Sequence, residues 1–360
     1  MGSKNIFSVN PDNINADIAR LVNRLLAPRF NEKVIGVDRL SGGVNSEAFK
    51  ILTDRSNEYF AKKYRIRKGD NRDRLSTEFF GLTFLWANDI RNIPEPIIAC
   101  EKSRVAVYRF IKGRKIELGG MSLADVDEAA EFTERLQCLR DAKGADVQPV
   151  ASEACFSVKE YMNCVETRIS RLNKADKKSI AFDALRSYLN DEFVPLYSAI
   201  KKMTVQKAKS LGIDIDKKMQ KYERTLSQSD FGFHNAIKTE NGRVFFIDFE
   251  YYGWDDPVKL IADFYLQPAV PVPVNYREHF FEKVRKNYSK DTKLEKRLPI
   301  IYPILGLKWC LIMLNVFHRI GEGAIDEAKC LERIDRATEK LEAIRREIDI
   351  RSFPLSLTRT

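Results

Sequence analysis

Three polar residues in the second half of the sequence have the types and spacing of a catalytic centre. Asp230 is followed five residues later by Asn235, and Asp248 lies thirteen residues beyond that asparagine. Asn241-Gly242 lies between them and is typical of a two-residue hairpin turn, in which both central residues take positive φ. We therefore predict a two-residue loop that pairs Asn235 with Asp248, with their Cβ atoms about 4.5–5.5 Å apart.

This predicted pair has the chemistry of a magnesium site. An amide and a carboxylate both offer hard oxygen, and Mg²⁺ takes one or two such ligands, keeps several waters and completes its shell with substrate phosphates. A further aspartate that binds no metal, Asp230, is suited to accept the proton of an attacking hydroxyl. Charge interactions strengthen in a partly dry site. Four phenylalanines predict such a site here: Phe231, Phe233, Phe246 and Phe249.

The same segment resembles the catalytic signature of the aminoglycoside phosphotransferase and choline kinase superfamily, which has a protein-kinase-like fold. Members of that superfamily read H-G-D-x-x-x-x-N, then I-D-F or I-D-W, then G-D-P. The resemblance implies that Asp230 is the catalytic base and that Asn235 and Asp248 are the metal ligands. Residues 253–257, Gly-Trp-Asp-Asp-Pro, resemble the closing segment.

The motif departs from the family pattern at two positions. Gln228 stands where the family has histidine, and Ser229 stands where it has glycine. The family histidine mainly supports the loop by hydrogen bonding, and a glutamine amide can do the same. An active kinase is therefore the main expectation, and a catalytically weak or silent nucleotide-binding protein of the same fold is the alternative.

The resemblance also implies a phosphate-binding loop and a lysine near the start of the chain. Residues 41–46 are glycine-rich and lie between two predicted strands, so their backbone N–H groups can approach phosphate oxygens. The family strand favours Lys62 as the phosphate-binding lysine, with Glu78 as its ion-pair partner, whereas the protein-kinase A-x-K spacing selects Lys63. Only one of these neighbours can face the cleft, because successive strand residues point to opposite faces. The predicted nucleotide-binding residues are Gly42, Gly43, Asn45, Ser46, Lys62 and Glu78, with Arg109, Phe110 and Ile111 as a hinge that binds adenine.

The elements that must position these residues divide the chain into two parts. Helical periodicity predicts helices over 11–27 and 72–87, beside five strands at 34–40, 47–53, 58–64, 97–100 and 104–111. Later helices are predicted at 122–141, 156–173, 178–203, 214–226, 257–266, 275–289, 304–319 and 324–349, with a hairpin at 235–249. We expect an α+β, protein-kinase-like fold with two lobes. Residues 1–112 would form an N-terminal lobe with a five-stranded antiparallel sheet, and residues 113–360 a larger, mainly helical C-terminal lobe.

Composition limits the other classes of function. The net charge is +10, and the six cysteines contain no C-x-x-C pair, which disfavours zinc and redox motifs. The start of the chain has no apolar signal segment, so we expect a cytoplasmic protein. The apolar stretch 298–317 contains Lys308 and two prolines, which predicts a buried helix and no membrane partner. The basic stretch 276–297 leaves nucleic-acid binding as a weaker alternative, because charge runs usually form solvated faces.

The resemblance implies an ATP-dependent kinase that uses Mg²⁺. It would move the γ-phosphoryl group to a hydroxyl of a small-molecule acceptor, such as an aminoglycoside, an amino alcohol or a sugar. A protein kinase would need an activation segment ending in Ala-Pro-Glu. The few residues between Asp248 and the segment 253–257 leave no room for one. The motifs do not identify the acceptor.

Overall fold

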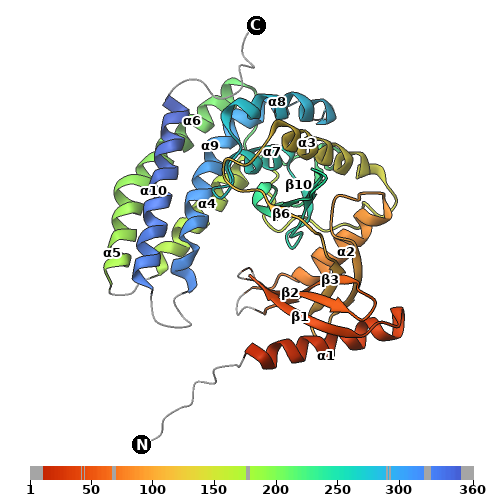
Figure 1. Ribbon diagram of the computed structural model, residues 1–360. Helices are drawn as coiled ribbons and strands as arrows, with labels where there is room; N and C mark the ends of the chain where they lie inside the picture. The colour runs from red at the N-terminus through yellow and green to blue at the C-terminus, as the bar shows by residue number, and fades with distance from the viewer. Residues whose placement is uncertain are drawn as a thin grey trace, which may run out of the picture.

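The computed structural model describes residues 11–41, 43, 45–66, 70–175, 179–288, 291, 293–319 and 326–349. A sheet-based lobe and a mainly helical lobe are visible in Figure 1. The predicted α+β, two-lobed architecture is confirmed, including the five-stranded antiparallel sheet.

The N-terminal sheet forms from short segments rich in β-branched and aromatic residues, and its inner strand β5 is an almost continuous buried run, Val-Ala-Val-Tyr. Its order is β1 (Val34–Leu40), β2 (Ser46–Thr53), β3 (Glu58–Tyr64), β5 (Val105–Arg109) and β4 (Pro96–Cys100). Every neighbouring pair is antiparallel, so short connections suffice between most of the strands. The central strand β3 is the one that carries the candidate lysines.

Helix α1 (Pro11–Phe30) covers one face of this sheet and lies beneath β1 to β3 in Figure 1. Its apolar stripe packs against Tyr59 and Ala61 of β3, among other buried residues. Because side chains alternate along a strand, Lys62 points to the opposite face. That face is covered by α2 (Arg74–Ala87), which carries Glu78. Side-chain alternation on β3 therefore selects which lysine enters the space between the lobes.

Helix α2 packs closely against the C-terminal lobe. It begins at a side-chain cap in which Asp73 accepts a hydrogen bond from the Ser76 N–H at 3.1 Å. A Cβ atom on Gly81 would lie 2.4 Å from Cδ1 of Tyr252. Only glycine permits this approach, so the residue type at position 81 sets how near α2 comes to the segment after Asp248.

The C-terminal lobe contains two groups of helices. In Figure 1, α4, α5, α6, α9 and α10 lie side by side, and α3, α7 and α8 lie nearer the hairpin. Their bounds are α3 Leu123–Cys138, α4 Val158–Lys174, α5 Ile180–Ser187, α6 Val194–Ser210, α7 Pro257–Leu266, α8 Val274–Val284, α9 Leu294–Met313 and α10 Glu327–Asp349. A π-helical segment, Tyr188–Phe193, joins α5 to α6, and short 3₁₀ turns occur at Leu139–Asp141, Lys221–Glu223, Phe233–Asn235, Arg285–Tyr288 and Leu314–Arg319.

Short strands form two small sheets in this lobe. Strand β6 (Arg114–Lys115) pairs with β8 (Ala236–Lys238), which in turn pairs with β9 (Val244–Phe246). Strand β7 (Thr225–Ser227) pairs with β10 (Gly253–Asp255). These pairings bring the segments before Asp230 and after Asp248 together.

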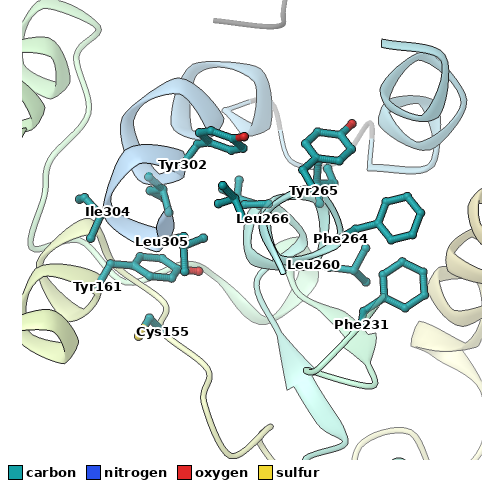
Figure 2. Close-up of a cluster of buried hydrophobic side chains, with 14 of the residues drawn as sticks. Cys155, Tyr161, Phe231, Leu260, Phe264, Tyr265, Leu266, Tyr302, Ile304 and Leu305 are labelled. Carbon is teal, nitrogen blue, oxygen red and sulfur yellow. The ribbon is translucent and has the colours of Figure 1, made fainter. Parts of the chain in front are cut away.

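The core of the C-terminal lobe lies directly behind the catalytic segment. All ten residues of α7 are buried. The ring of Phe231, the residue after Asp230, stacks on Phe264 of α7 with a centroid distance of 5.0 Å. Figure 2 shows these rings together with Leu260 and Tyr265 of the same helix. The segment that carries Asp230 is therefore anchored by packed aromatic side chains.

The helix predicted over 214–226 is wrong. The structure has a 3₁₀ turn at Lys221–Glu223 followed by strand β7, whose three residues are all buried. Its partner β10 lies more than twenty residues further along the chain, so local periodicity gave no sign of it. Tertiary pairing overrides local helical preference here.

The helix predicted over 304–319 begins ten residues earlier than expected. Helix α9 starts at Leu294 and includes Pro299 and Pro303, and a 3₁₀ turn continues it to Arg319. The two prolines remove backbone hydrogen bonds, but α9 packs against α4, α7 and α10, and burial outweighs that loss. Leu294–His318 is long and apolar enough to cross a membrane, yet 78% of its most apolar window is buried inside the protein.

Candidate active site

The hairpin that carries the candidate residues has a different turn from the predicted one. Strands β8 and β9 pair Ala236 with Phe246 and Lys238 with Val244. The Thr239 N–H then donates to Arg243 O at 2.9 Å, which leaves residues 240–242 as a three-residue loop. Its last residue, Gly242, has φ 83°, and its N–H donates to the Thr239 carbonyl at 2.9 Å. This is a turn followed by a left-handed glycine, so the predicted two-residue loop is wrong.

The change of loop length shifts the register by one residue. The N–H of Ile247 donates to the carbonyl of Asn235 at 2.9 Å, so Asn235 lies opposite Ile247. The predicted direct pairing of Asn235 with Asp248 is therefore wrong. Asp248 instead leaves the strand with φ 67°, and its Oδ1 lies 2.6 Å from Nζ of Lys62. A left-handed backbone turn, and not cross-strand pairing, directs this carboxylate between the lobes.

Asp230 lies half-buried in the loop before the hairpin, in contact with two neighbours. Nε2 of His234 lies 3.2 Å from its Oδ1, and Nδ2 of Asn235 donates to its Oδ2 at 3.1 Å. Burial alone would raise the pKa of Asp230, but the hydrogen bond from His234, nearby positive charge and the Asn235 amide lower it below its usual value. The carboxylate is thus ionised and able to accept a proton.

The two departures from the family motif have clear structural consequences. Ser229 takes the left-handed conformation, with φ 68°, which explains why a glycine suits this position. Gln228 is fully buried, and its Nε2 donates to the carbonyl of Ile247. The glutamine amide therefore ties the loop before Asp230 to the segment before Asp248 by hydrogen bonding.

Replacing Gln228 by leucine is expected to lower the free energy of unfolding by about 1–3 kcal/mol, because the buried carbonyl of Ile247 would lose its donor. Urea unfolding of the purified variant measures this change. The control is Gln148→Leu, since Gln148 is only half-buried and donates to Gly144 O at 3.0 Å within its own turn. Equal losses in both variants would contradict a special role for Gln228.

Lys259 is a supporting residue that the sequence analysis missed. It is 1% exposed, and its Nζ donates to Ser229 O at 2.7 Å. The same ammonium group lies 3.1 Å from Asp255 and 2.8 Å from Asp263, and these carboxylates raise its pKa although burial opposes this. The i, i+4 spacing of Asp255, Lys259 and Asp263 in the sequence indicated this pairing, although only the last two lie on helix α7. Asp255 is thereby occupied in supporting the loop.

The structure places Lys62 in the space between the lobes. Its Nζ lies 2.6 Å from Oε2 of Glu78 and 2.6 Å from Oδ1 of Asp248, whereas Lys63 is half-buried on the other face. Burial alone would lower the pKa of Lys62, but these carboxylates raise it well above its usual value. The other Glu78 oxygen accepts a hydrogen bond from the Phe249 N–H at 3.2 Å, so Glu78 also links α2 to the C-terminal lobe.

Glu250 is a second residue whose place only the structure reveals. It is 4% exposed and lies 3.6 Å from Lys62 and 3.5 Å from Arg74. The amide of Asn45, in the glycine-rich loop, donates to Glu250 and also to the Tyr251 hydroxyl at 3.0 Å. The loop therefore reaches across to the segment after Asp248.

The remaining nucleotide-binding candidates lie near this loop and at the end of β5. Ser46 is buried at the start of β2, a Cβ on Gly43 would meet open space, and Gly42 lies outside the described residues. In the predicted hinge, the N–H of Arg109 donates to Glu95 O at 2.9 Å and that of Phe110 to Glu58 O at 3.2 Å. Among the described residues, the N–H of Ile111 has no such partner, so it is the donor free to meet an adenine.

The donor set at the hairpin end fits a magnesium ion. Asn235 uses its Nδ2 on Asp230, which leaves its Oδ1 without a partner within the part of the chain described. Asp248 uses Oδ1 on Lys62, and its side chain is 41% exposed. Two hard oxygens on neighbouring segments, open to a phosphate-bearing ligand, match what Mg²⁺ requires.

Three carboxylates, Glu78, Asp248 and Glu250, also have oxygens within 4.8 Å of one another. All three lie around the ammonium group of Lys62, whose single positive charge offsets part of theirs, and Glu250 also lies 3.5 Å from Arg74. We therefore interpret these three carboxylates as the groups that hold the Lys62 side chain in place.

Comparison with known proteins finds similarity in structure only. No family model matches the sequence, and no curated protein matches it. A spectinomycin phosphotransferase, solved with ADP and spectinomycin, has a TM-score of 0.63 at 13% identity, over 91% of this chain and 98% of that one. A choline kinase from Cryptosporidium parvum has a TM-score of 0.62 at 15% identity, over 96% of this chain and 99% of that one.

An ethanolamine kinase from Plasmodium vivax is similar at a TM-score of 0.57 and 16% identity, over 94% of this chain and 89% of that one. At such low identity the similarities show the fold. The resemblance inferred from the sequence is confirmed at that level: the chain has the two-lobed fold found in aminoglycoside phosphotransferases and choline kinases.

Proposed function

We propose that this protein is an ATP-dependent kinase that moves a phosphoryl group to a hydroxyl of a small molecule. The observation that carries the proposal is the arrangement around Lys62, which lies buried between Glu78 and Asp248 while Asp230 stays ionised in the neighbouring loop. Phosphoryl transfer needs a phosphate-binding cation, a metal-binding carboxylate and a base for the attacking hydroxyl. The chain has one residue for each role.

Asp230 would act on the acceptor. Its carboxylate takes the proton of the hydroxyl as that oxygen attacks the γ-phosphorus, and the bond from phosphorus to ADP breaks. His234 and Asn235 hold the carboxylate in place through their contacts at 3.2 and 3.1 Å. These contacts leave the base oriented and charged before the acceptor arrives.

Asn235 and Asp248 would hold Mg²⁺, which supplies positive charge to the transferring phosphates. Lys62 would bind the phosphates directly, and Glu78 would hold its ammonium group in position. The adenine would meet the Ile111 N–H. Among the described residues, Asn235 and Ile111 offer a polar atom without a partner, and the Asp248 side chain is 41% exposed.

The acid limb of the pH–rate profile is expected to lie below the usual aspartate pKa of 3.8, because the pKa of Asp230 is lowered. A lowered pKa means that the reactive, ionised form is present above that value and is lost only as the pH falls through it. Measurement of kcat/KM between about pH 8 and pH 5 checks this, and we expect no loss of rate from this group. An acid limb near pH ~6 would contradict it.

The direct test is a screen for ATP consumption with aminoglycosides, amino alcohols, sugars and their derivatives as acceptors. Acceptor-dependent release of ADP supports the proposal. Tight binding of Mg·ATP with no release of ADP from any acceptor would favour the silent nucleotide-binding protein instead. The hydrogen bond from Gln228 favours an active enzyme, since it gives the loop the support that the family histidine provides.

A further inference from the structure

Three basic side chains from three different parts of the fold converge on one carboxylate. Relative to Glu153 oxygens, Arg168 of α4 lies at 2.8 Å, Lys308 of α9 at 3.2 Å and Arg72, just before α2, at 3.8 Å. These three residues are called the basic cluster below. Arg72 also donates to Asp70 at 2.7 and 2.8 Å, so its charge is largely used there. Among the described residues, Arg168 and Lys308 share Glu153 as their carboxylate partner.

The basic cluster has more donors than the protein satisfies. Lys308 is 4% exposed, yet its ammonium group, which carries three N–H donors, is paired within the described part of the chain only with Glu153. Nε of Arg168 is buried and has no hydrogen-bond partner. Buried donors without acceptors cost free energy, so these groups are suited to bind an anion.

The charges of the basic cluster contribute to the pKa shifts of two titratable neighbours. The pKa of His318 is lowered by burial and by the charges of Arg171 and Arg168. The pKa of the Cys164 thiol is lowered to about 5 by a hydrogen bond with Cys155 together with the charges of Lys308 and Arg168, although burial opposes this. Arg168 contributes to both shifts in the direction expected of a nearby positive charge, which disfavours a cation and favours an anion.

The basic cluster is connected to Tyr251, in the segment that follows Asp248. The N–H of Ser152, next to Glu153, donates to Tyr251 O at 3.2 Å, and Tyr251 comes three residues after Asp248. The guanidinium of Arg72, from the N-terminal lobe, lies 5.2 Å from the centre of the Tyr251 ring. The cluster therefore spans the two lobes at the segment after the metal-binding aspartate.

A second connection leads from the basic cluster to Asp230. Trp309, next to Lys308, donates to Oδ1 of Asp263 at 2.9 Å. The other Asp263 oxygen pairs with Lys259 at 2.8 Å, and Lys259 holds the carbonyl that precedes Asp230. The cluster and the catalytic base thus share one supporting network.

On the premise that the chain is a kinase, we propose that its acceptor is an anionic hydroxy compound, bound by Arg168 and Lys308 through a phosphate or carboxylate group. The planar fork of an arginine matches either group with two hydrogen bonds, and a lysine adds a point charge. Positive charge at this position repels aminoglycosides and amino alcohols, which are cations. The hydroxyl of the bound anion reaches Asp230, which takes its proton as the oxygen bonds to the γ-phosphorus and ADP leaves.

The test measures binding without turnover, on the full chain with Mg·ADP present. The probes are orthophosphate and four matched hexoses: glucose, glucosamine, glucose 6-phosphate and glucuronate. Calorimetry is expected to show that at least one of the anions binds about tenfold or more tightly than glucose and glucosamine. The comparison of glucose 6-phosphate with glucuronate decides whether the anionic group is a phosphate or a carboxylate.

Variants locate the binding to the cluster. Arg168→Gln and Lys308→Met should each remove the preference for anions and leave the affinity for Mg·ADP unchanged, and Arg168→Lys should restore part of it. Arg72→Gln alters a partly exposed side chain and keeps the core intact. Lys201→Met is the control, because Lys201 pairs with Glu166 at 2.6 Å on the surface of α6.

Two results would overturn the proposal: no anion binding more tightly than glucose or glucosamine, or anion binding that none of the cluster variants changes. Because binding is measured without turnover, the outcome is independent of the kinase function. If no acceptor caused release of ADP, the kinase function would be wrong. The anion-binding result would still stand or fall by the binding measurements.

Discussion

Replacing Asp230 by asparagine is expected to lower kcat by about 10²–10⁴-fold, the usual contribution of a positioned general base. The amide has nearly the same shape but cannot accept the proton of the acceptor. Affinity for Mg·ATP should remain within about twofold, because Asp230 contacts His234 and Asn235 and not Lys62. Steady-state release of ADP and calorimetry with Mg·ATP measure the two quantities.

The control for this variant is Asp183→Asn. Asp183 is 72% exposed on α5 and pairs with Arg186 at the surface, so its loss should alter neither quantity. If the Asp230 variant turned over at the wild-type rate, its assignment as the base would be wrong. If it lost Mg·ATP binding as well, its role would be metal binding or folding.

Replacing Asp248 by alanine is expected to weaken Mg·ATP binding by about 10–100-fold, or ~1.4–2.8 kcal/mol, and to remove its dependence on Mg²⁺. The physical reason is that one of two hard oxygens for the metal is lost. Lys62 keeps its ion pair with Glu78 at 2.6 Å, so the phosphate-binding cation stays in position. Calorimetry with ATP, with and without Mg²⁺, measures the effect.

Two further variants separate metal binding from phosphate binding. Lys62→Met should weaken ATP binding in the absence of Mg²⁺ as well, because an ammonium group contacts phosphate without a metal. The exposed Asp146 has no role in the site, and Asp146→Ala should leave both titrations unchanged. An Asp248 variant whose ATP affinity still rises with Mg²⁺ as in the wild type would rule out Asp248 as a ligand.

Elements in both lobes could be predicted where their sequence signals are local. The strand β3 and the helix α7 have the predicted bounds, since a short run of strand-forming residues and an Asp-Pro helix start are recognised from a few neighbouring residues. The strand β7 could not be predicted, because its three residues become a strand only by pairing with β10. The predicted start of α9 was wrong for a similar reason, because burial keeps Pro299 and Pro303 inside the helix.

The basic stretch at 276–297 also depends on tertiary contacts that the sequence does not reveal. Arg297 pairs with Asp256 and Asp291, and Arg277 pairs with Glu347 at 3.2 Å. Lys283 pairs with Asp127. These charges are used within the lobe, which leaves fewer of them for a nucleic acid than the sequence suggested.

The sequence by itself determined which chemical groups the site contains. The spacing of Asp230, Asn235 and Asp248, and the strand upstream that carries Lys62, can be recognised in the sequence alone, because the chain itself sets the spacing of a motif. Tertiary structure alone decided their directions: a three-residue loop moved the hairpin register by one, and the positive φ of Asp248 turned its carboxylate toward Lys62. A register shift of one residue reverses which side chains face each other, and short sequence signals do not resolve it. Only folding brought Arg168 and Lys308 to Glu153, since helices α4 and α9 lie far apart in the chain and meet through packing.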